Sequence, residues 1–223
     1  MASRFFVAGT DTGIGKTYIS VGLLKAFNRL GHATLGIKPI ASGCIRQDNK
    51  FLNEDALALQ QASSVQLDYD YINPFAFEPA IAPHIAAARV NMPLTLENIL
   101  HKTHYALNYP ADISIVEGVG GWYVPLNQHE TMADLVISLK LPVILVVGIR
   151  LGCLNHTLLT YQAIKGAGLM LAGWVANCPV PGSTETMEMV DTLKNWLNAP
   201  CLGVIDFQEK PEEKLDPAAL MQR

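Results

Sequence analysis

The residues with the clearest chemical meaning form one glycine-rich segment near the N-terminus, Gly9-Thr10-Asp11-Thr12-Gly13-Ile14-Gly15-Lys16-Thr17. An apolar run precedes this segment, and a pattern of helical period follows it. A glycine-rich turn between a strand and a helix presents backbone N–H groups, and the helix N-terminus adds a partial positive charge. A lysine in this place reaches terminal phosphates, and a threonine hydroxyl can ligate Mg²⁺. The segment therefore predicts a cradle for a phosphorylated ligand.

The segment fits the strict phosphate-loop pattern with one displacement. That pattern puts four residues between its first glycine and Gly-Lys, whereas Thr10 holds the glycine position here and Gly9 comes one residue earlier. The glycines at 9, 13 and 15 also match the turn of short-chain dehydrogenases. The motif alone leaves open a nucleoside triphosphate or a nicotinamide cofactor.

A carboxylate ends another apolar run. Glu117 follows residues 113–116 and precedes Gly118-Val119-Gly120-Gly121. A buried carboxylate is costly without a partner, and in a phosphate-loop enzyme that partner is the metal ion. The glycines permit close approach of a ligand to the backbone. The simpler alternative is a glutamate that caps a loop.

Asp55 lies in the first turn of an expected helix. Acidic residues are favoured there, so its spacing alone indicates a helix-start acid. Together with Thr17 and Glu117, however, Asp55 is a third hard oxygen ligand for Mg²⁺.

Lys38 ends the second apolar run and precedes Pro39-Ile40-Ala41-Ser42-Gly43. If Lys16 serves the phosphates, Lys38 can neutralise a second, anionic reactant. A lysine at this position argues against NAD, whose ribose is bound by an acid near the end of the second strand. Ser42, in a turn of small residues, is more often a turn residue than a ligand.

Two asparagines have two interpretations each. Asn155 closes the segment Gly152-Cys153-Leu154-Asn155 and can cap the helix that follows, or the N–H groups there can hold a substrate carboxylate. Asn177 ends an apolar run before Pro179, and can read a nucleobase edge or form a turn.

The dehydrogenase alternative has one further match, because Tyr161 and Lys165 have the Tyr-x-x-x-Lys spacing of that family. The same residues are simply i and i+4 neighbours on a helix. Residues 146–151 lack the serine that this family needs, and the alternative leaves Lys16, Thr17 and Glu117 unexplained.

These residues need a scaffold that brings strand ends together. Apolar runs predict strands at 4–8, 33–38, 113–117, 143–147, 171–177 and 201–205, and helical periodicity predicts helices at 16–30, 54–62, 95–108, 131–139, 155–167 and 185–197. Uniformly apolar strands are buried on both faces, so we expect an α/β fold with a mostly parallel sheet flanked by helices on both faces. Ligands bind at the carboxyl ends of such strands. Residues 68–93 are expected to form an irregular loop over the site, and a polar tail begins at about residue 208.

Composition narrows the class of protein. The 223 residues are 50% hydrophobic and 16% charged, which is typical of one folded domain. The net charge of −4 favours no nucleic acid partner. Four isolated cysteines indicate free thiols in a reducing compartment. We find no signal peptide, and the apolar run 142–149 is too short for a membrane span, so we expect a cytoplasmic protein.

Taken together, the segments are similar to the dethiobiotin synthetase family over residues 5–205. The similarity rests on Gly-Thr-Asp-Thr-x-x-Gly-Lys-Thr, Lys38-Pro39-x-Ala41-Ser42-Gly43, Asp55-Ala56-Leu57-Ala58-Leu59-Gln60, Pro83-His84-Ile85, Val116-Glu117-Gly118-x-Gly120-Gly121-Trp122, Leu151-Gly152-Cys153-Leu154-Asn155-His156 and Ala172-Gly173-Trp174-Val175-Ala176-Asn177. The family shares the longer glycine spacing, and this accounts for the displacement at Thr10. The resemblance implies a P-loop NTPase-like fold and a homodimer.

The resemblance also implies a reaction, the ATP- and Mg²⁺-dependent ring closure of 7,8-diaminononanoate with CO₂ to dethiobiotin in biotin synthesis. One amine takes up CO₂ as a carbamate, whose oxygen attacks the γ-phosphate. The second amine then closes the cyclic urea and expels phosphate.

Family likeness assigns the site residues. Lys16 and Lys38 are the catalytic pair, Thr17, Asp55 and Glu117 hold Mg²⁺, and Thr12, Ser42, Gly152, Cys153, Leu154 and Asn155 bind substrate. The ATP site comprises Gly13, Ile14, Gly15, Lys16, Thr17, Tyr18, Asp55, Glu117, Gly118, Val119, Gly120, Asn177, Cys178, Asp206, Phe207, Gln208 and Glu212. The family often has Ile-Pro-Trp where this chain has Ile205-Asp206-Phe207.

Two relatives of the fold are alternatives. ParA/MinD-like ATPase switches usually carry an extra lysine near the position of Asp11, and this chain has none there. A cobyrinate-type amide synthetase would need a glutaminase domain, for which the chain is too short.

Overall fold

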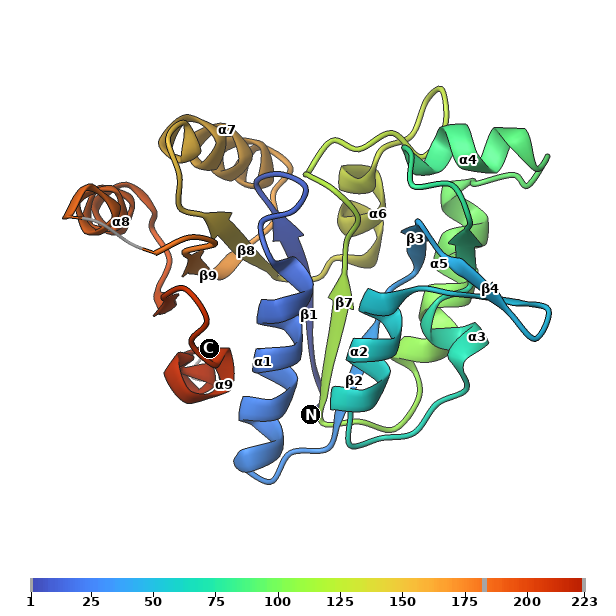
Figure 1. Cartoon of the computed structure of the whole chain (residues 1–223), viewed down its shortest axis with the longest axis horizontal. Helices are drawn as coiled ribbons and strands as arrows, with labels where there is room; N and C mark the ends of the chain where they lie inside the picture. The colour runs from blue at the N-terminus through green and yellow to red at the C-terminus, as the bar shows by residue number, and fades with distance from the viewer. Residues whose placement is uncertain (1, 182–183, 222–223) are drawn as a thin grey trace.

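A six-stranded parallel sheet forms the centre of the molecule in the computed structural model, which describes residues 2–181 and 184–221 (Figure 1). The strand order is β10-β9-β8-β1-β7-β2. The strands are β1 (Ser3–Gly9), β2 (Thr34–Ile37), β7 (Ile113–Glu117), β8 (Val143–Gly148), β9 (Leu171–Asn177) and β10 (Cys201–Ile205). All six correspond to predicted strands.

The register of three neighbouring strands aligns their carboxyl ends. Val7 of β1 lies opposite Glu117 of β7, and Ile37 of β2 lies opposite Val116. Every residue of β7, β8 and β9 is buried, as expected for strands covered on both faces. The loop after β1, the residue after β2 and the last residue of β7 therefore meet at one edge of the sheet.

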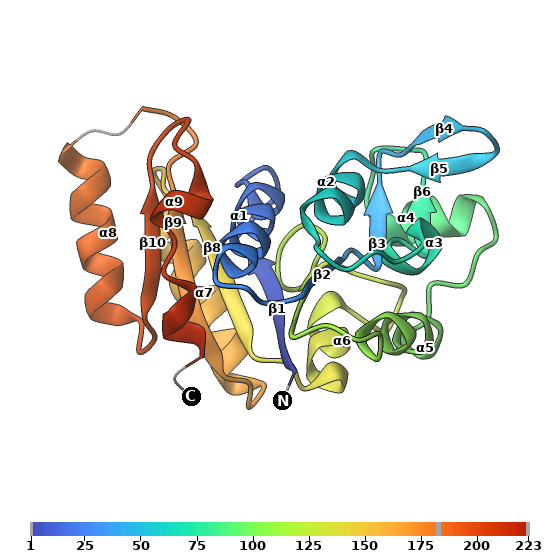
Figure 2. The same ribbon diagram turned by 90° about the horizontal axis from the view of Figure 1, so that it is seen from below.

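Helices cover both faces of the sheet (Figure 2). One apolar core joins the sheet to α1 (Lys16–Arg29), α2 (Glu54–Ala62), Leu215 at the end of α9 (Pro211–Lys214) and the 3₁₀ turn Pro217–Leu220. The other joins it to α5 (Leu96–Leu107), α6 (Met132–Leu139), α7 (Cys153–Gly166) and α8 (Thr184–Trp196). The predicted α/β fold with helices on both faces is confirmed. None of the helices in the described part of the chain has the length and apolar character that a membrane crossing requires.

The segment 68–93 is more regular than predicted. It contains α3 (Tyr69–Ile72), β6 (Phe75–Phe77) and α4 (Pro83–Arg89), and β6 pairs in parallel with β3 (Ile40–Ser42). Each element is at most seven residues long, too short to give a periodic sequence pattern. The pairing with β3 holds this segment beside the turn that carries Ser42.

The polar segment after residue 208 also folds. Its helix α9 packs on α1 so closely that a Cβ atom on Gly22 would lie 2.4 Å from Cβ of Pro211. Arg29 donates a hydrogen bond to the carbonyl of Glu212 at 2.9 Å. The glycine on α1 thus permits an approach that the polarity of the segment did not predict.

Candidate active site

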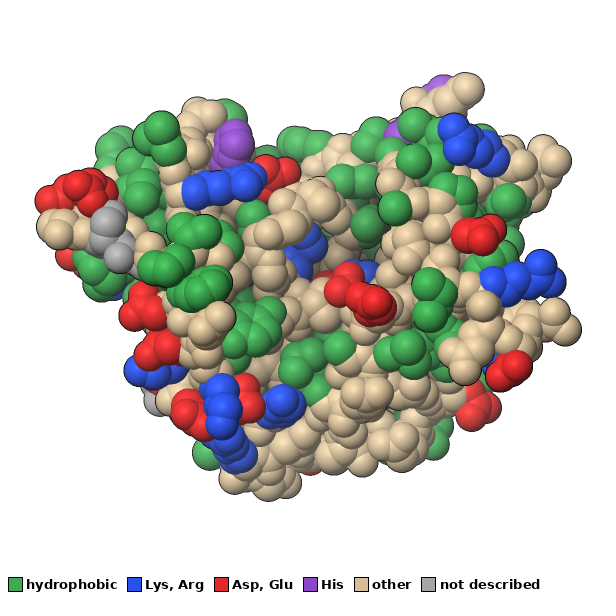
Figure 3. Space-filling model, in the orientation of Figure 1, with side chains coloured by type: hydrophobic (Ala, Val, Ile, Leu, Met, Phe, Trp, Pro, Cys, Tyr) green, Lys and Arg blue, Asp and Glu red, His purple; other side chains and the backbone are tan. Residues whose placement is uncertain are grey.

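The strand ends converge as predicted, and they surround a cavity of about 870 Å³. Figure 3 shows this face of the molecule hollowed, with basic side chains at the floor of the hollow. The lining includes Thr12, Gly13, Gly15, Lys16, Thr17, Tyr18, Lys38, Ser42, Asp55, Val119 and Gly120, all of which the sequence placed in the site. Glu117 lies beneath the lining with no exposed surface.

The glycine-rich loop is shaped by Gly15 and fixed by Asn177. Gly15 has a φ of 84°, and a Cβ atom there would lie 2.3 Å from Nδ2 of Asn177. That amide nitrogen donates to the carbonyl of Ile14 at 2.7 Å. A side chain at position 15 would therefore both strain the backbone and break the contact with β9. Lys16 curls back over the loop and donates to the carbonyl of Asp11 at 3.0 Å.

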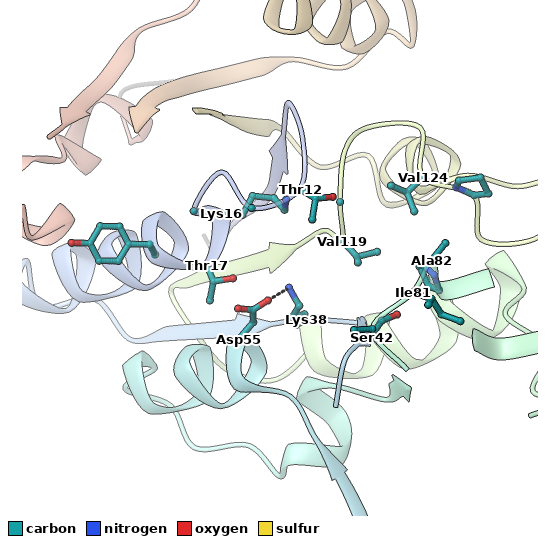
Figure 4. Close-up of a pocket in the computed structure, with 17 residues that line it drawn as sticks. Thr12, Lys16, Thr17, Lys38, Ser42, Asp55, Ile81, Ala82, Val119 and Val124 are labelled. Atoms are coloured by element: carbon teal, nitrogen blue, oxygen red, sulfur yellow. Dashed lines mark ion pairs between the residues drawn. The ribbon is translucent and has the colours of Figure 1, made fainter. Parts of the chain in front are cut away.

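Glu117 and the side chains of Thr17, Lys38 and Asp55, which Figure 4 shows, form a polar network below the loop. Oε1 of Glu117 accepts hydrogen bonds from Nζ of Lys38 at 2.6 Å and from Oγ1 of Thr17 at 2.7 Å. Nζ of Lys38 also lies 3.0 Å from Oδ2 of Asp55. Lys38 and Glu117 are buried, whereas the side chain of Asp55 is half exposed. The buried charges therefore compensate each other within the site.

Burial by itself lowers the pKa of Lys38, but the carboxylates of Glu117 and Asp55 outweigh it, so the pKa is raised above its ordinary value. Burial raises the pKa of Asp55, and the ammonium of Lys38, followed by Thr17 and Lys16, reverses that effect and lowers it. Lys38 is thus held as a cation and Asp55 as an anion.

Lys16 differs from Lys38 because none of the carboxylates in the described part of the chain forms an ion pair with it. Burial and, to a lesser extent, the charge of Lys38 lower the pKa of Lys16 to about 8, although the more distant Glu117 and Asp55 oppose the shift. An anion that enters the loop therefore stabilises the charged form of Lys16.

This lowered pKa predicts a pH dependence of stability. Between about pH 8 and 10.5 the unfolded chain holds the Lys16 proton and the folded chain does not, so the free energy of unfolding rises with pH. Below pH 8 both states are protonated, and the folded state carries a penalty of about 3 kcal/mol. We expect Lys16→Met to be more stable than the wild type at pH 7, with the difference closing towards pH 10.5, as measured by urea unfolding at a series of pH values. An advantage that does not change with pH would contradict the assignment.

The residues around Glu117 suit a divalent cation. The second carboxylate oxygen of Glu117, Oε2, is buried and has no hydrogen-bond partner among the described residues. Together with Thr17 and Asp55 it offers hydroxyl and carboxylate oxygens, which Mg²⁺ prefers. The described residues contain no group of three or more His, Cys, Asp or Glu side chains that could hold a metal by themselves. Two carboxylates and a hydroxyl leave coordination positions for phosphate oxygens and water.

Other predicted residues lie outside the lining of the cavity. Ile14 and Cys178 are buried, and the pKa of the Cys178 thiol is raised to about 11 by burial, then by Asp206. Phe207 is partly exposed, and Glu212 pairs with Lys25 of α1 at 3.5 Å. Gly118, Gln208 and the segment Gly152-Cys153-Leu154-Asn155 are also absent from the lining. The nucleotide and substrate contacts of these residues stay predictions.

The start of α7 shows that the interpretation of Asn155 as a helix cap is wrong. The helix begins at Cys153, and Gly152, with a φ of 92°, is its N-cap without a side-chain hydrogen bond. Asn155 lies inside the first turn. The helix N-terminus therefore keeps its backbone N–H groups free of any side-chain cap.

Six residues of the cavity wall were not named as site residues from the sequence. Ala80, Ile81, Ala82, Pro83, Val124 and Pro125 also line it. The first four belong to the segment expected over the site, and the Pro83-His84-Ile85 motif marked it. Val124 and Pro125 follow the glycines after Glu117, and no pattern in the sequence distinguished them. A second missed contact is the 2.5 Å ion pair of Asp11 with Arg150, which joins the loop to the segment before α7.

The fold and the loop define the class as a P-loop NTPase. A family model described as an AAA domain matches residues 3–214. The septum site-determining protein MinD from Pyrococcus horikoshii, solved with Mg-ADP, has a TM-score of 0.56 at 17% identity, covering 99% of this chain and 89% of its own. The cell division protein FtsY from Thermotoga maritima has a TM-score of 0.52 at 16% identity, covering 100% and 68%. At these identities the likeness shows the fold alone.

Sequence relatives define the family. A Marinobacter nauticus protein named ATP-dependent dethiobiotin synthetase BioD is 47% identical over 97% of this chain and 93% of its own length. The Pseudomonas aeruginosa (strain UCBPP-PA14) protein of the same name is 50% identical over 92% and 90%. ATP-dependent dethiobiotin synthetase BioD 1 of Escherichia coli (strain K12) is 46% identical over 95% and 94%. The chain belongs to the dethiobiotin synthetase family.

Proposed function

We propose that this protein is the ATP- and Mg²⁺-dependent cyclo-ligase that converts 7,8-diaminononanoate and CO₂ to dethiobiotin, ADP and phosphate. One amine adds to CO₂ and loses a proton to form a carbamate. A carbamate oxygen attacks the γ-phosphorus, and ADP leaves. The second amine then attacks the carbonyl carbon of the mixed anhydride and expels phosphate, which closes the cyclic urea.

One observation carries the proposal. Two lysines and a set of oxygen ligands surround the same cavity, at the end of a phosphate loop. The reaction brings together two anions, the triphosphate and the carbamate, which repel each other in solution. Lys16 on the loop and Lys38 across the cavity can each neutralise one of them.

The nucleotide side of the proposal uses the loop. The N–H groups of Gly13, Ile14 and Gly15 would bind phosphate oxygens, and Lys16 would stabilise the charge of the phosphoryl group during transfer. Thr17, Asp55 and Glu117 would hold Mg²⁺, which when bound neutralises phosphate charge. Asn177 lies at the end of β9 beside the loop, where its amide would contact adenine. The remaining predicted ATP contacts are Tyr18, Gly118, Val119, Gly120, Cys178, Asp206, Phe207, Gln208 and Glu212.

The substrate side uses Lys38, Ser42 and Thr12. Lys38 would bind the carbamate and the mixed anhydride, and the two hydroxyls would orient the amines. Oγ of Ser42 is buried on the cavity wall and has no hydrogen-bond partner among the described residues. A buried hydroxyl without a hydrogen-bond partner destabilises the empty protein, so a hydrogen bond from a polar ligand to Ser42 would favour binding.

We further propose a homodimer in which the start of α7 reaches the partner's substrate. The segment Gly152–Asn155 does not line the cavity of its own chain, yet its N–H groups suit a carboxylate. Leu151 beside it is 98% exposed, and Leu159 on α7 is 63% exposed. Apolar side chains as exposed as these gain from burial in an interface. The four free cysteines fit a cytoplasmic enzyme.

The dimer has its own test. We expect Leu151→Glu to place a charge in the interface and convert the protein to a monomer, as measured by light scattering after size exclusion. The KM for the diamine should rise when the dimer is lost, while the KM for ATP should change little. Lys102→Glu, at an exposed position of α5, is the matched surface control. A monomeric wild type would contradict the proposal.

The reaction is tested by ATP turnover with and without the diamine and bicarbonate. We expect phosphate release to require both, and mass spectrometry to find one dethiobiotin for each ADP. Hydrolysis that ignores the diamine would overturn the proposed function.

Glu117→Gln tests the metal set. The change keeps the shape of the side chain and removes one anionic ligand, so the Mg²⁺ concentration needed for half-maximal activity should rise at least about tenfold. Lys38 loses a charged partner in the same variant, so folding must be checked by circular dichroism. An unchanged Mg²⁺ requirement would exclude Glu117 as a ligand.

A further inference from the structure

The carboxylates proposed for Mg²⁺ already hold a cation. Nζ of Lys38 lies 2.6 Å from Oε1 of Glu117 and 3.0 Å from Oδ2 of Asp55. Thr17, the third proposed ligand, donates to the same Oε1 at 2.7 Å. The ammonium group and a metal ion on Oε2 of Glu117, which has no hydrogen-bond partner among the described residues, would therefore lie side by side on the same carboxylates.

Glu117 is separated from the cavity by the side chains that line it. This carboxylate has no exposed surface and does not line the cavity, whereas Lys38 and Thr17 do. An ion that enters from the cavity thus meets the ammonium and the hydroxyl before it reaches the carboxylate. Two cations in contact with one carboxylate repel each other strongly in a buried site.

The side chain of Lys38 can move into the cavity while its backbone stays in place. Its backbone is fixed, because its N–H donates to the carbonyl of Ile72 at 2.9 Å and its carbonyl accepts from Asn73 at 2.7 Å. Only the side chain can therefore move, and in Figure 4 it lies between Asp55 and Ser42. On the Ser42 side it would enter the part of the cavity assigned to the substrate.

We propose that Lys38 and the divalent cation exchange places on Glu117 and Asp55, so that the lysine reaches the substrate cavity only when the metal is bound. The inference rests on the proposed function for the role of the lysine after its release. The inference adds an order of events. In the absence of metal, Lys38 neutralises the carboxylates of Glu117 and Asp55. Once the metal is bound, the ammonium group of Lys38 is available to an anionic carbamate.

The exchange is tested without ATP or diamine. Mn²⁺ binding to the nucleotide-free protein is measured by electron paramagnetic resonance. We expect Lys38→Met to bind Mn²⁺ at least about tenfold more tightly than the wild type, because the competing charge is gone. Lys16→Met is the matched control, since it removes a buried charge of the same site that contacts no carboxylate. Because the charges of Glu117 and Asp55 also act on Lys16, its loss should tighten Mn²⁺ binding too, but by a smaller factor than the loss of Lys38. Lys38→Arg keeps the charge and should bind weakly, like the wild type.

A second measurement uses the wild type and does not depend on the folding of any variant. Reductive methylation of each lysine is followed by peptide mass spectrometry with and without saturating Mn²⁺. We expect the rate at Lys38 to rise several-fold with metal and the rate at exposed Lys102 to stay constant. An unchanged rate at Lys38, or an affinity of Lys38→Met no greater than that of Lys16→Met, would overturn the exchange. A wild type that makes no dethiobiotin would instead overturn the proposed function, whatever these two measurements show.

Discussion

Lys16→Met is expected to lower kcat for dethiobiotin formation by about 10³-fold, while the protein becomes more stable at pH 7. The activity is lost because the ammonium stabilises charge that develops on the transferring phosphoryl group. The stability rises because burial lowers the pKa of Lys16 to about 8, so its charged form is a cost to the empty protein. Single-turnover kinetics with saturating ATP and urea unfolding at pH 7 measure the two effects.

Two results would separate catalysis from binding. If Lys16 acts in the transition state, the KM for ATP changes less than kcat. Lys102→Met, an exposed lysine on α5, is the control for a lost charge and should leave both quantities unchanged. A variant that keeps near-full kcat would remove Lys16 from the chemistry.

Much of this site was predictable because its residues stand at strand ends. Apolar runs define the strands, and parallel strands align their carboxyl ends, so Lys38 and Glu117 had to meet near the loop after β1. The loop motif and the glycines after Glu117 supplied the chemistry. The positions of these residues thus follow from local patterns together with one rule of topology.

The partners of each side chain did not follow from the sequence. Metal chemistry explained a carboxylate at position 117, but nothing in the pattern indicated that Lys38 would bind it. The hairpin of β4 (Ile45–Gln47) and β5 (Lys50–Leu52) was also missed, because its strands are almost wholly exposed and carry no apolar alternation. Its turn is made by Asp48 and Asn49, whose φ angles of 48° and 63° suit a two-residue hairpin. Apolar periodicity therefore predicts neither the ion-pair partners of side chains nor strands that are exposed to solvent.

Lys38→Met is expected to lower kcat by about 10²- to 10³-fold, as Lys16→Met does, but with the opposite effect on stability. Lys38 is the closest cation to Glu117, which has no exposed surface. Removing one partner of a buried ion pair leaves an uncompensated charge and costs about 3–5 kcal/mol. Urea unfolding in the absence of metal should show this loss, and turnover with saturating ATP and diamine should show the catalytic defect.

Metal distinguishes the two roles of Lys38. If the lysine neutralises Glu117 and Asp55 only until a divalent cation arrives, Mg²⁺ should restore most of the stability of Lys38→Met and none of its turnover. The restored stability follows from mass action, since the ion binds the folded state alone. Lys38→Arg should keep the stability without metal and lose part of the turnover, because a guanidinium is too broad to replace an ammonium against a carbamate. Turnover that returns together with stability would show that Lys38 supports the fold of the site and takes no part in the reaction.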